Sequence, residues 1–203
     1  MGYTTDFQGQ LNFDRVLTNE EVNYIKKFND SRRMKRDVSK LYDIYKGEGG
    51  NPFLPKEETY GNEGEYFVGG TGEYGQYTDD SVIDVNQSPG SVIKGKDEDF
   101  GTYWSRYQKQ IQGGLCQPGL WCQWTVEQQF EGGEFVLVWD GGEKFYNYVE
   151  WLKYLINHFF EKWGVKLNGE ITWVGEDSED MGKIVVVDND VTVKVARITY
   201  ENI

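Results

Sequence analysis

Residues 145–163, FYNYVEWLKYLINHFFEKW, are the most regularly patterned stretch of this 203-residue chain. Apolar side chains recur there at i, i+3, i+4 and i+7, the spacing that gives an α-helix one continuous apolar stripe. The stripe comprises Phe145, Tyr148, Val149, Leu152, Leu155, Ile156, Phe159, Phe160 and Trp163. Gly164 follows, where a left-handed helix end favours a residue without Cβ. The stretch therefore predicts a long helix that packs on a sheet.

Alternating or β-branched runs on both sides of this helix predict the sheet itself. They are residues 7–13, 120–126, 135–139, 183–188 and 191–196, with one more strand around Ile171 and Trp173. Gly132-Gly133 and residues 188–190 are turn sequences, so each is expected to close a hairpin. A first helix is predicted just after residue 18, because Thr18 and Glu21 have the spacing of a capping box.

Without residues 30–117 the order is strand, helix, strand, strand, helix, strand, which is typical of the ferredoxin-like split β-α-β arrangement. We therefore expect an α+β fold in one domain, residues 1–203. Its core would be residues 1–29 and 118–174, with 30–117 as an insertion and 175–203 as an added C-terminal hairpin. Both helices should cover one face of an antiparallel sheet. The other face would carry Trp121, Thr125, Val136, Val138 and Val174, so we expect the insertion to cover part of it.

The composition of the insertion changes along its length. It starts with a basic segment, followed by a short helix that Gly47 would stop. Residues 47–90 are rich in Gly, Tyr and acidic side chains, and within them only 66–68 resembles a strand. Such a segment is either mobile or a tyrosine-rich cover, and its aromatic content favours the cover. Residues 100–111 predict another helix, whose aromatic side chains we expect to pack.

Composition limits the classes of function. Lys plus Arg total 21 against 34 for Asp plus Glu, a formal net charge of -13. This charge disfavours duplex nucleic acid as a partner and is typical either of a solubilising surface or of one that docks on a basic partner. No apolar run approaches the roughly 18 residues of a membrane span. With two cysteines, of which Cys122 falls in a predicted strand, we expect a cytoplasmic protein with reduced thiols.

Catalytic motifs do not stand out. The single histidine, His158, lies in the middle of the long helix, where a packed or surface position is commoner than a general base. No nucleophile elbow, zinc spacing or phosphate loop is present. We therefore expect no catalytic residue, metal or cofactor, while carboxylate chemistry by Asp140 with Glu143 remains an alternative.

Two binding surfaces can be nominated. The first is an anion site for a small phosphorylated ligand, because clustered guanidinium groups suit bidentate capture of phosphate. It comprises Arg32, Arg33, Lys35 and Arg36, with Tyr74, Tyr77 or Trp121 available for stacking. The same cations could instead balance carboxylates of the chain. The second is a partner surface of Trp121, Trp151, Tyr154, His158, Glu176, Asp177, Glu179 and Asp180.

Several runs carry a resemblance to a known group of proteins. They are MGYTT at residues 1–5, RRMKRD at 32–37, QPGLWCQW at 117–124, WDGGEKFY at 139–146 and YVEWL at 148–152. Together they resemble a family of uncharacterised proteins encoded by tailed phages and prophages, over most of the chain outside roughly residues 87–115. The family has no assigned activity. The resemblance implies a phage accessory protein made in the cytoplasm of a bacterial host.

These observations favour a non-enzymatic, acidic interaction module that binds a host protein. A small-anion or nucleotide-binding module using residues 32–36 is the alternative, and an enzyme with carboxylate chemistry a further one. The oligomeric state does not follow from the sequence.

Overall fold

A six-stranded antiparallel sheet forms the centre of the computed structural model, which describes residues 2–69, 78–177 and 179–197. The strand order is β4-β5-β1-β6-β7-β8. The bounds are β1 Thr5–Phe13, β4 Trp124–Gln128, β5 Phe135–Trp139, β6 Leu167–Gly175, β7 Met181–Val187 and β8 Asp190–Val195. The expected α+β class with an antiparallel sheet is thus confirmed.

Strand β1 lies inside the sheet and pairs along its whole length with β6, from Thr5 opposite Gly175 to Phe13 opposite Leu167. On its other side Leu11 pairs with Leu137 of β5. The strands β7 and β8 are joined through Asp188 and Asn189, which both have positive φ, as a two-residue hairpin turn requires. Both predicted hairpins are therefore present.

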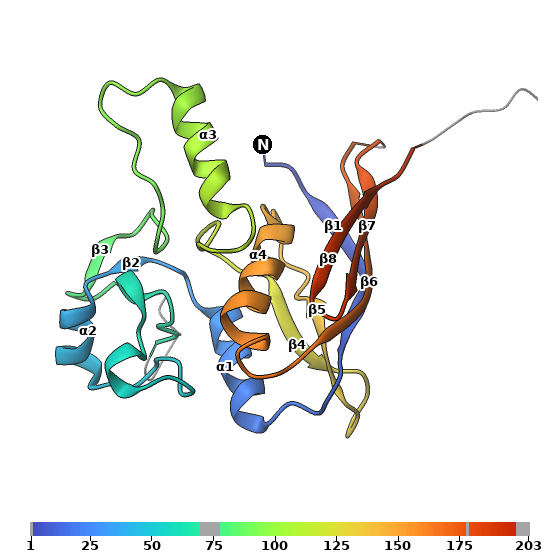
Figure 1. Ribbon diagram of the computed structural model, residues 1–203, viewed down its shortest axis with the longest axis horizontal. Coiled ribbons are helices and arrows are strands. Elements are labelled where there is room, and N and C mark those ends of the chain that lie inside the picture. The colour runs from blue at the N-terminus through green and yellow to red at the C-terminus, as the bar shows by residue number, and fades with distance from the viewer. Residues whose placement is uncertain (1, 70–77, 178, 198–203) are drawn as a thin grey trace, which may run out of the picture.

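Two helical segments cover one face of the sheet: α1 (Asn19–Asp30), and α4 (Tyr148–Leu155) continued by the π-helix η3 (Ile156–Phe160) (Figure 1). The capping box of α1 is present, with Thr18 and Glu21 exchanging their hydrogen bonds. The main core lies between these helices and the sheet, and its largest fully buried members include Trp124, Trp151 and Phe28.

The long helix differs from the prediction at its start and in its middle. It begins at Tyr148 rather than Phe145, after Asn147 with a φ of 54°. Its second half is widened, since the Glu161 N–H donates to the Ile156 carbonyl five residues back, at 2.9 Å. The widened turn keeps both Phe159 and Phe160 in the core. Gly164 ends the segment with a φ of 69°, as predicted.

The opposite face of the sheet is more polar than the sequence analysis expected. The β1 residues that alternate with buried Phe7 and Leu11 are Gln8, Gln10 and Asn12. On neighbouring strands an ion pair at 2.7 Å joins Lys183 and Glu170. Of the apolar residues expected on this face, Val174 is 50% exposed, whereas Thr125 and Val136 are buried, so the face is open to water at Val174 but not along β4 and β5.

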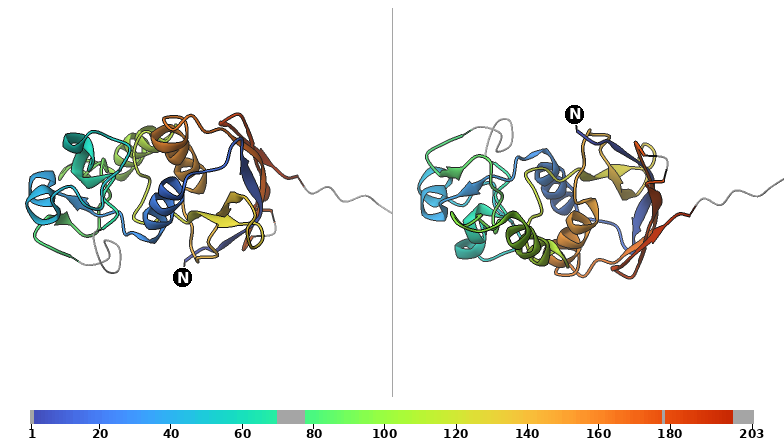
Figure 2. Two further views of the ribbon diagram at one scale, coloured as in Figure 1. Left: turned by 90° about the horizontal axis from the view of Figure 1, so that it is seen from below. Right: turned by 90° about the horizontal axis from the view of Figure 1, so that it is seen from above.

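The insertion lies elsewhere than expected. It packs against the outer side of the helices, and the helices separate it from the sheet (Figures 1 and 2). The Tyr24 hydroxyl of α1 donates to the Tyr66 carbonyl at 2.9 Å, and the Ser31 hydroxyl donates to the Val68 carbonyl at 3.1 Å. The expectation that it covers the second face of the sheet is wrong.

Within the insertion the structure has β2 (Lys35–Arg36), α2 (Val38–Tyr45), η1 (Lys56–Glu58), η2 (Asn62–Gly64), β3 (Val82–Asp84) and α3 (Phe100–Ile111). The strands β2 and β3 form a two-stranded ribbon that the sequence analysis missed. Conversely, residues 66–68 are buried without being a strand, and residues 120–123 precede β4 rather than belonging to it. The helices at 38–45 and 100–111 are confirmed.

Strand β8 forms one edge of the sheet and remains open to solvent. Its alternating valines extend past the helix layer, and Val193 and Val195 are 43% and 70% exposed. Across the described parts of the chain, no helix has the length and apolar character that crossing a membrane requires.

Candidate functional site

Two cavities flank the backbone of residues 118–120, which we call the 118–120 bridge. The Trp104 cavity, of about 540 Å³, is lined by the bridge, α3 and residues between 86 and 94. The Trp121 cavity, of about 520 Å³, is lined by the bridge, Trp121 and residues from 143 to 151. The bridge is thus a wall common to both cavities.

The bridge is fixed by hydrogen bonds from three directions. The Pro118 carbonyl accepts from the Tyr107 hydroxyl of α3 at 2.6 Å and from Asn147 Nδ2, just before α4, at 3.1 Å. The Leu120 carbonyl accepts from the Arg33 N–H at 2.8 Å. The wall is therefore held in place by Arg33 and α3, which both belong to the insertion, and by Asn147 just before α4.

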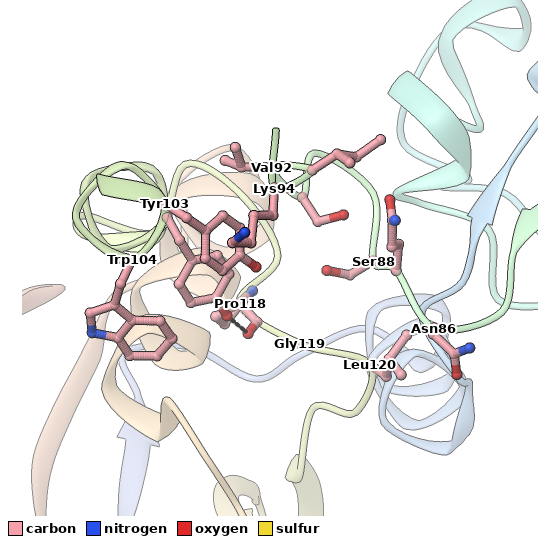
Figure 3. Close-up of a pocket in the computed structure, with 13 residues that line it drawn as sticks. Asn86, Ser88, Val92, Lys94, Tyr103, Trp104, Pro118, Gly119 and Leu120 are labelled. Carbon is pink, nitrogen blue, oxygen red and sulfur yellow. Dashed lines mark hydrogen bonds between the residues drawn. The ribbon is translucent and has the colours of Figure 1, made fainter. Parts of the chain in front are cut away.

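In the Trp104 cavity, Tyr103 and Trp104 of α3 lie on one wall, with Ser88 and Asn86 across from them (Figure 3). Trp104 is 46% exposed, although the sequence analysis expected the aromatic side chains of this helix to pack. The reason is that α3 buries only Ile111 and leaves its aromatic side to the cavity and solvent. Ser91 Oγ, in the lining, is buried without a hydrogen-bond partner among the described residues.

In the Trp121 cavity, two exposed aromatic side chains surround a buried one. Trp121 and Tyr146 are 41% and 52% exposed, whereas Trp151 is 1% exposed and still contributes to the lining. A Cβ atom added at Gly119 of the bridge would lie 3.8 Å from Trp151 Nε1. The indole N–H of Trp151 therefore borders the cavity just beneath the bridge.

That indole N–H differs from those of three other tryptophans near the core. Trp124 donates to the Tyr148 carbonyl, Trp139 to Gln123 Oε1 and Trp173 to Asp180 Oδ1. The Trp151 N–H has no acceptor in the part of the chain that the structure describes. It is a donor available to whatever occupies the Trp121 cavity.

Glu176, Asp177, Glu179 and Asp180 form an acidic loop, and one side chain connects Asp180 of this loop to the cavity. Tyr3 makes the connection: its N–H donates to the Tyr146 hydroxyl at 3.2 Å, and its own hydroxyl donates to Asp180 Oδ2 at 2.7 Å. Nearby, the Thr4 N–H donates to Glu176 Oε1 at 2.7 Å. Tyr3 thus connects Tyr146, which lines the Trp121 cavity, to the carboxylate of Asp180.

Tyr154 does not belong to that surface. It is 0% exposed, stacks with Phe28 at 6.1 Å and receives a hydrogen bond from Gln117 Nε2 at 3.1 Å. The helical stripe turns it toward the insertion, and because the insertion packs on the helices, its ring is covered. Its nomination as a surface residue is wrong.

His158 is held inside the protein by both ring nitrogens. Nδ1 lies 2.9 Å from the Tyr66 hydroxyl and Nε2 lies 3.3 Å from the Leu115 carbonyl, while the ring stacks on Tyr154 at 4.0 Å. Burial, together with the positive charge of Lys162, lowers the pKa of His158 to about 4. The imidazole is therefore neutral at pH 7 and joins the insertion to η3.

Two arginines of the nominated anion site, Arg33 and Arg36, are directed inward. Arg33 is 1% exposed, donates to the Phe67 and Glu65 carbonyls at 2.6 and 2.7 Å, and lies over the Phe28 ring at 4.2 Å. Arg36 is 2% exposed and donates to Asp79 Oδ2 at 2.8 Å. Both guanidinium groups hold the insertion together.

The other two cations of that cluster do not complete an open site either. Lys35 forms an ion pair with Glu63 at 2.6 Å. Arg32 is half-buried, and its Nε has no partner among the described residues. Neither lines the Trp104 or the Trp121 cavity. Tyr74 and Tyr77, nominated for stacking, lie outside the described residues.

The two carboxylates suggested for acid–base chemistry, Asp140 and Glu143, have different roles in the structure. Asp140 accepts from Asn29 Nδ2 at 2.8 Å and from the Gly142 N–H at 2.7 Å, so it fixes a turn. Glu143 lines the Trp121 cavity.

Cys122 is a buried free thiol. Burial raises its pKa to about 12, as its predicted core position implies. Within the described residues, no cluster of three potential metal ligands occurs.

Comparisons with protein-family models, with curated proteins and with solved structures find no match to this chain.

Sequence reasoning found Trp121 and Trp151 but missed Tyr146, Trp104 and the bridge. One signal was available: QPGLW combines two residues that interrupt regular structure with a tryptophan, which is typical of an exposed aromatic beside a turn. The contribution of α3 could not be inferred, since amphipathic spacing does not reveal whether an apolar side meets a core or a cavity.

Proposed function

We propose that this protein is a non-enzymatic interaction module that binds a partner protein at the 118–120 bridge. The observation that carries the proposal is the gathering of exposed aromatic side chains at two adjoining cavities: Trp104, Trp121 and Tyr146. Exposed Trp and Tyr beside well-formed pockets are typical of the residues that dominate binding energy in protein interfaces.

Charge supports a partner with a basic surface. The chain carries a net charge of -13, and Tyr3 connects Tyr146 of the Trp121 cavity to the carboxylate of Asp180. Such a field accelerates the approach of a positively charged protein and disfavours nucleic acid. If the resemblance to phage-encoded proteins reflects the origin of this chain, the partner is a protein of the bacterial host and the module acts in its cytoplasm.

We further propose that the core is a ferredoxin-like split β-α-β unit to which β7 and β8 have been added. The neighbour order β4-β5-β1-β6, with α1 after β1 and α4 between β5 and β6, supports this arrangement. In this interpretation the insertion leaves the core after α1 and returns to it at the bridge, so the proposed surface forms where the two parts meet.

The test is affinity capture from bacterial lysate with the wild-type protein and two variants, at low and at high salt. Trp121→Ala removes an exposed aromatic ring from the cavity. Phe130→Ala removes another exposed ring, 68% exposed, from the distant β4–β5 turn. We expect a partner that Trp121→Ala loses and Phe130→Ala retains, with recovery falling as salt screens the acidic surface.

Recovery of the same proteins by Trp121→Ala as by wild type would contradict the proposed surface. Since Trp121 is already 41% exposed, its removal should leave the fold intact, and circular dichroism of the variant checks this.

A further inference from the structure

We propose that the Trp121 cavity takes an extended, proline-containing segment that carries Lys or Arg, and that the indole N–H of Trp151 donates to a backbone carbonyl of that segment. This inference rests on the proposed function, because it names the class of partner that the same surface would bind. Four features of the cavity support it: its unpaired donor, the engaged carbonyls of the bridge, its aromatic lining and the acidic groups near it.

The donor is the indole N–H of Trp151. Trp151 is 1% exposed and rigidly packed, with its ring 6.2 Å from Phe28 and 5.8 Å from Tyr154. Its N–H has no acceptor within the described part of the chain, although the residue lines the cavity. A preorganised donor in an apolar pocket favours a ligand with a matching acceptor, because a hydrogen bond gains strength where water is excluded.

Two carbonyl groups of the bridge already accept hydrogen bonds. The Pro118 carbonyl accepts two hydrogen bonds, from Tyr107 and Asn147, and the Leu120 carbonyl accepts one from the Arg33 N–H. Along the bridge, an ordinary extended peptide would therefore bring its backbone N–H groups to carbonyls that are already engaged. Proline brings a carbonyl without an N–H, and polyproline II segments have no internal hydrogen bonds, so their carbonyls remain free.

The shape and lining agree with this ligand. The rings of Trp121, Tyr146 and Trp151 surround a cavity of about 520 Å³. Aromatic-lined grooves bind proline-rich segments because the pyrrolidine rings pack on aromatic faces and the segment loses little entropy on binding. The Trp104 cavity, on the other side of the bridge, offers Tyr103 and Trp104 for a continuation of the same segment (Figure 3).

The rim indicates the charge of the segment. Glu143 lines the cavity, and Tyr3 connects Tyr146 to Asp180 of the acidic loop. Glu143 and Lys144 are the one carboxylate and the one cation of the described lining, so the negative excess comes from Asp180, which Tyr3 connects to Tyr146, and from the net charge of -13. Lys or Arg beside the prolines would therefore complement the rim.

The experiment titrates the purified full chain with two blocked synthetic peptides. One has the sequence Arg-Pro-Pro-Arg-Pro-Pro-Arg, and the other has alanine in place of each proline, which keeps the charge but restores the N–H groups. Calorimetry measures affinity, and ¹⁵N NMR follows the indole N–H signals, with Trp151→Phe identifying that of Trp151. We expect the proline peptide to bind at least about tenfold more tightly and to shift the Trp151 signal downfield.

Gly119→Ala gives a second test that spares the core. The added methyl group would meet nothing closer than Trp151 Nε1 at 3.8 Å, so it should be tolerated while it covers the N–H. We expect Gly119→Ala and Trp121→Ala each to weaken binding about tenfold and Phe130→Ala to leave it unchanged.

Equal affinity for the two peptides, no binding of either, or binding that leaves the Trp151 signal in place would overturn the inference. The proposed function would survive any of these results if Trp121→Ala still loses the partner captured from lysate. The two claims therefore fail separately.

Discussion

Arg33 illustrates how a single residue can reverse its expected role. Its sequence neighbourhood suggested an anion site, yet its guanidinium is buried against two backbone carbonyls and the Phe28 ring. A guanidinium presents five donors in a fixed plane, which suits a point where several carbonyls of an irregular segment converge. The basic run RRMKRD thus organises the insertion from inside.

We expect Arg33→Ala to lower the free energy of unfolding by about 3 kcal/mol, because it leaves the Phe67 and Glu65 carbonyls buried without donors. Arg106→Ala is the matched control: Arg106 is surface-exposed and paired with Glu98 at 2.7 Å, and because solvent screens such a contact, its loss should change stability little. Urea denaturation of both variants measures the difference. Equal losses would show that Arg33 is no more structural than a surface arginine.

His158 makes stability depend on pH. Its pKa is lowered to about 4 by burial, whereas in the unfolded chain an ordinary value near 6.5 applies. Between these values the unfolded state binds more protons, so stability falls as the pH falls through this window. The expected loss at about pH 5 is roughly 1 to 2 kcal/mol, after allowance for partial exposure.

The comparison of wild type with His158→Gln isolates this effect. Lys162 lies near the ring, and the Glu65 carboxyl, whose pKa burial raises, opposes the trend by taking up a proton in the folded state. Both remain in the variant, so the difference between the two proteins reports His158 alone. Parallel stability curves from pH 7 to 5 would rule out a buried neutral imidazole.

At the scale of elements, periodicity predicted those whose apolar residues face one core. The helices α1, α3 and most of α4 follow from helical spacing, and Phe135–Trp139 and the β7–β8 hairpin from alternation and turn residues. Periodicity wrongly predicted strands at residues 66–68 and 120–123. These residues are buried or apolar, but their backbone is irregular. Their backbone groups bond to distant residues, such as Gly49 for Val68 and Arg33 for Leu120. No local pattern encodes such partners.

The same limit explains the site. Trp121 and Trp151 could be nominated because both lie near predicted elements, but the two cavities are lined by four separate segments, residues 86–94, 103–107, 118–123 and 143–151. The bridge depends on Tyr107 from α3 and on Asn147 before α4, which are 11 and 29 residues away from Pro118. The widened turn of η3 was equally hidden, since a π-helix has the same apolar composition as the helix it interrupts.

The N-cap of α1 is encoded by the local sequence, and its contribution to stability can be measured. Thr18 accepts from the Glu21 N–H at 3.2 Å, and Glu21 in turn accepts from the Thr18 N–H at 2.8 Å and from Arg15. Burial alone would raise the pKa of the Glu21 carboxyl, but these hydrogen bonds outweigh it and hold the pKa below its usual range.

We expect Thr18→Ala to cost about 1 kcal/mol of stability and Thr18→Ser to cost a few tenths, because serine keeps the accepting oxygen. Thermal unfolding followed by circular dichroism compares the two. If serine proved as costly as alanine, the contribution of Thr18 would come from its methyl group and not from the cap.

On the scale of the whole molecule, the insertion is a third layer that shares the core of the other two. Tyr66 and Val68 belong to the main cluster with α1 and α4. Two buried contacts join the insertion to α1: the Tyr24 hydroxyl donates to the Tyr66 carbonyl, and Arg33 lies over the Phe28 ring. The insertion should therefore unfold together with the sheet and not as a separate unit.

Native-state hydrogen exchange tests this. The amide of Val68, bonded to the Gly49 carbonyl at 2.7 Å, and that of Arg33, bonded to Leu120 at 2.8 Å, should exchange only by global unfolding, as the β1 amides do. Amides of α3, which buries one residue, should exchange through local opening and orders of magnitude faster. Fast exchange at Val68 together with slow exchange in β1 would mean that the insertion opens independently.

The open edge at β8 has a consequence for how copies of the molecule behave together. Its outer backbone groups and the exposed Val193 and Val195 could accept a further strand from another copy. At neutral pH a charge of -13 keeps copies apart, but at pH values close to 4.6, where the net charge vanishes, this repulsion disappears while protonation of His158 loosens the fold. Mild acid should thus convert a well-dispersed acidic protein into one prone to strand-to-strand aggregation.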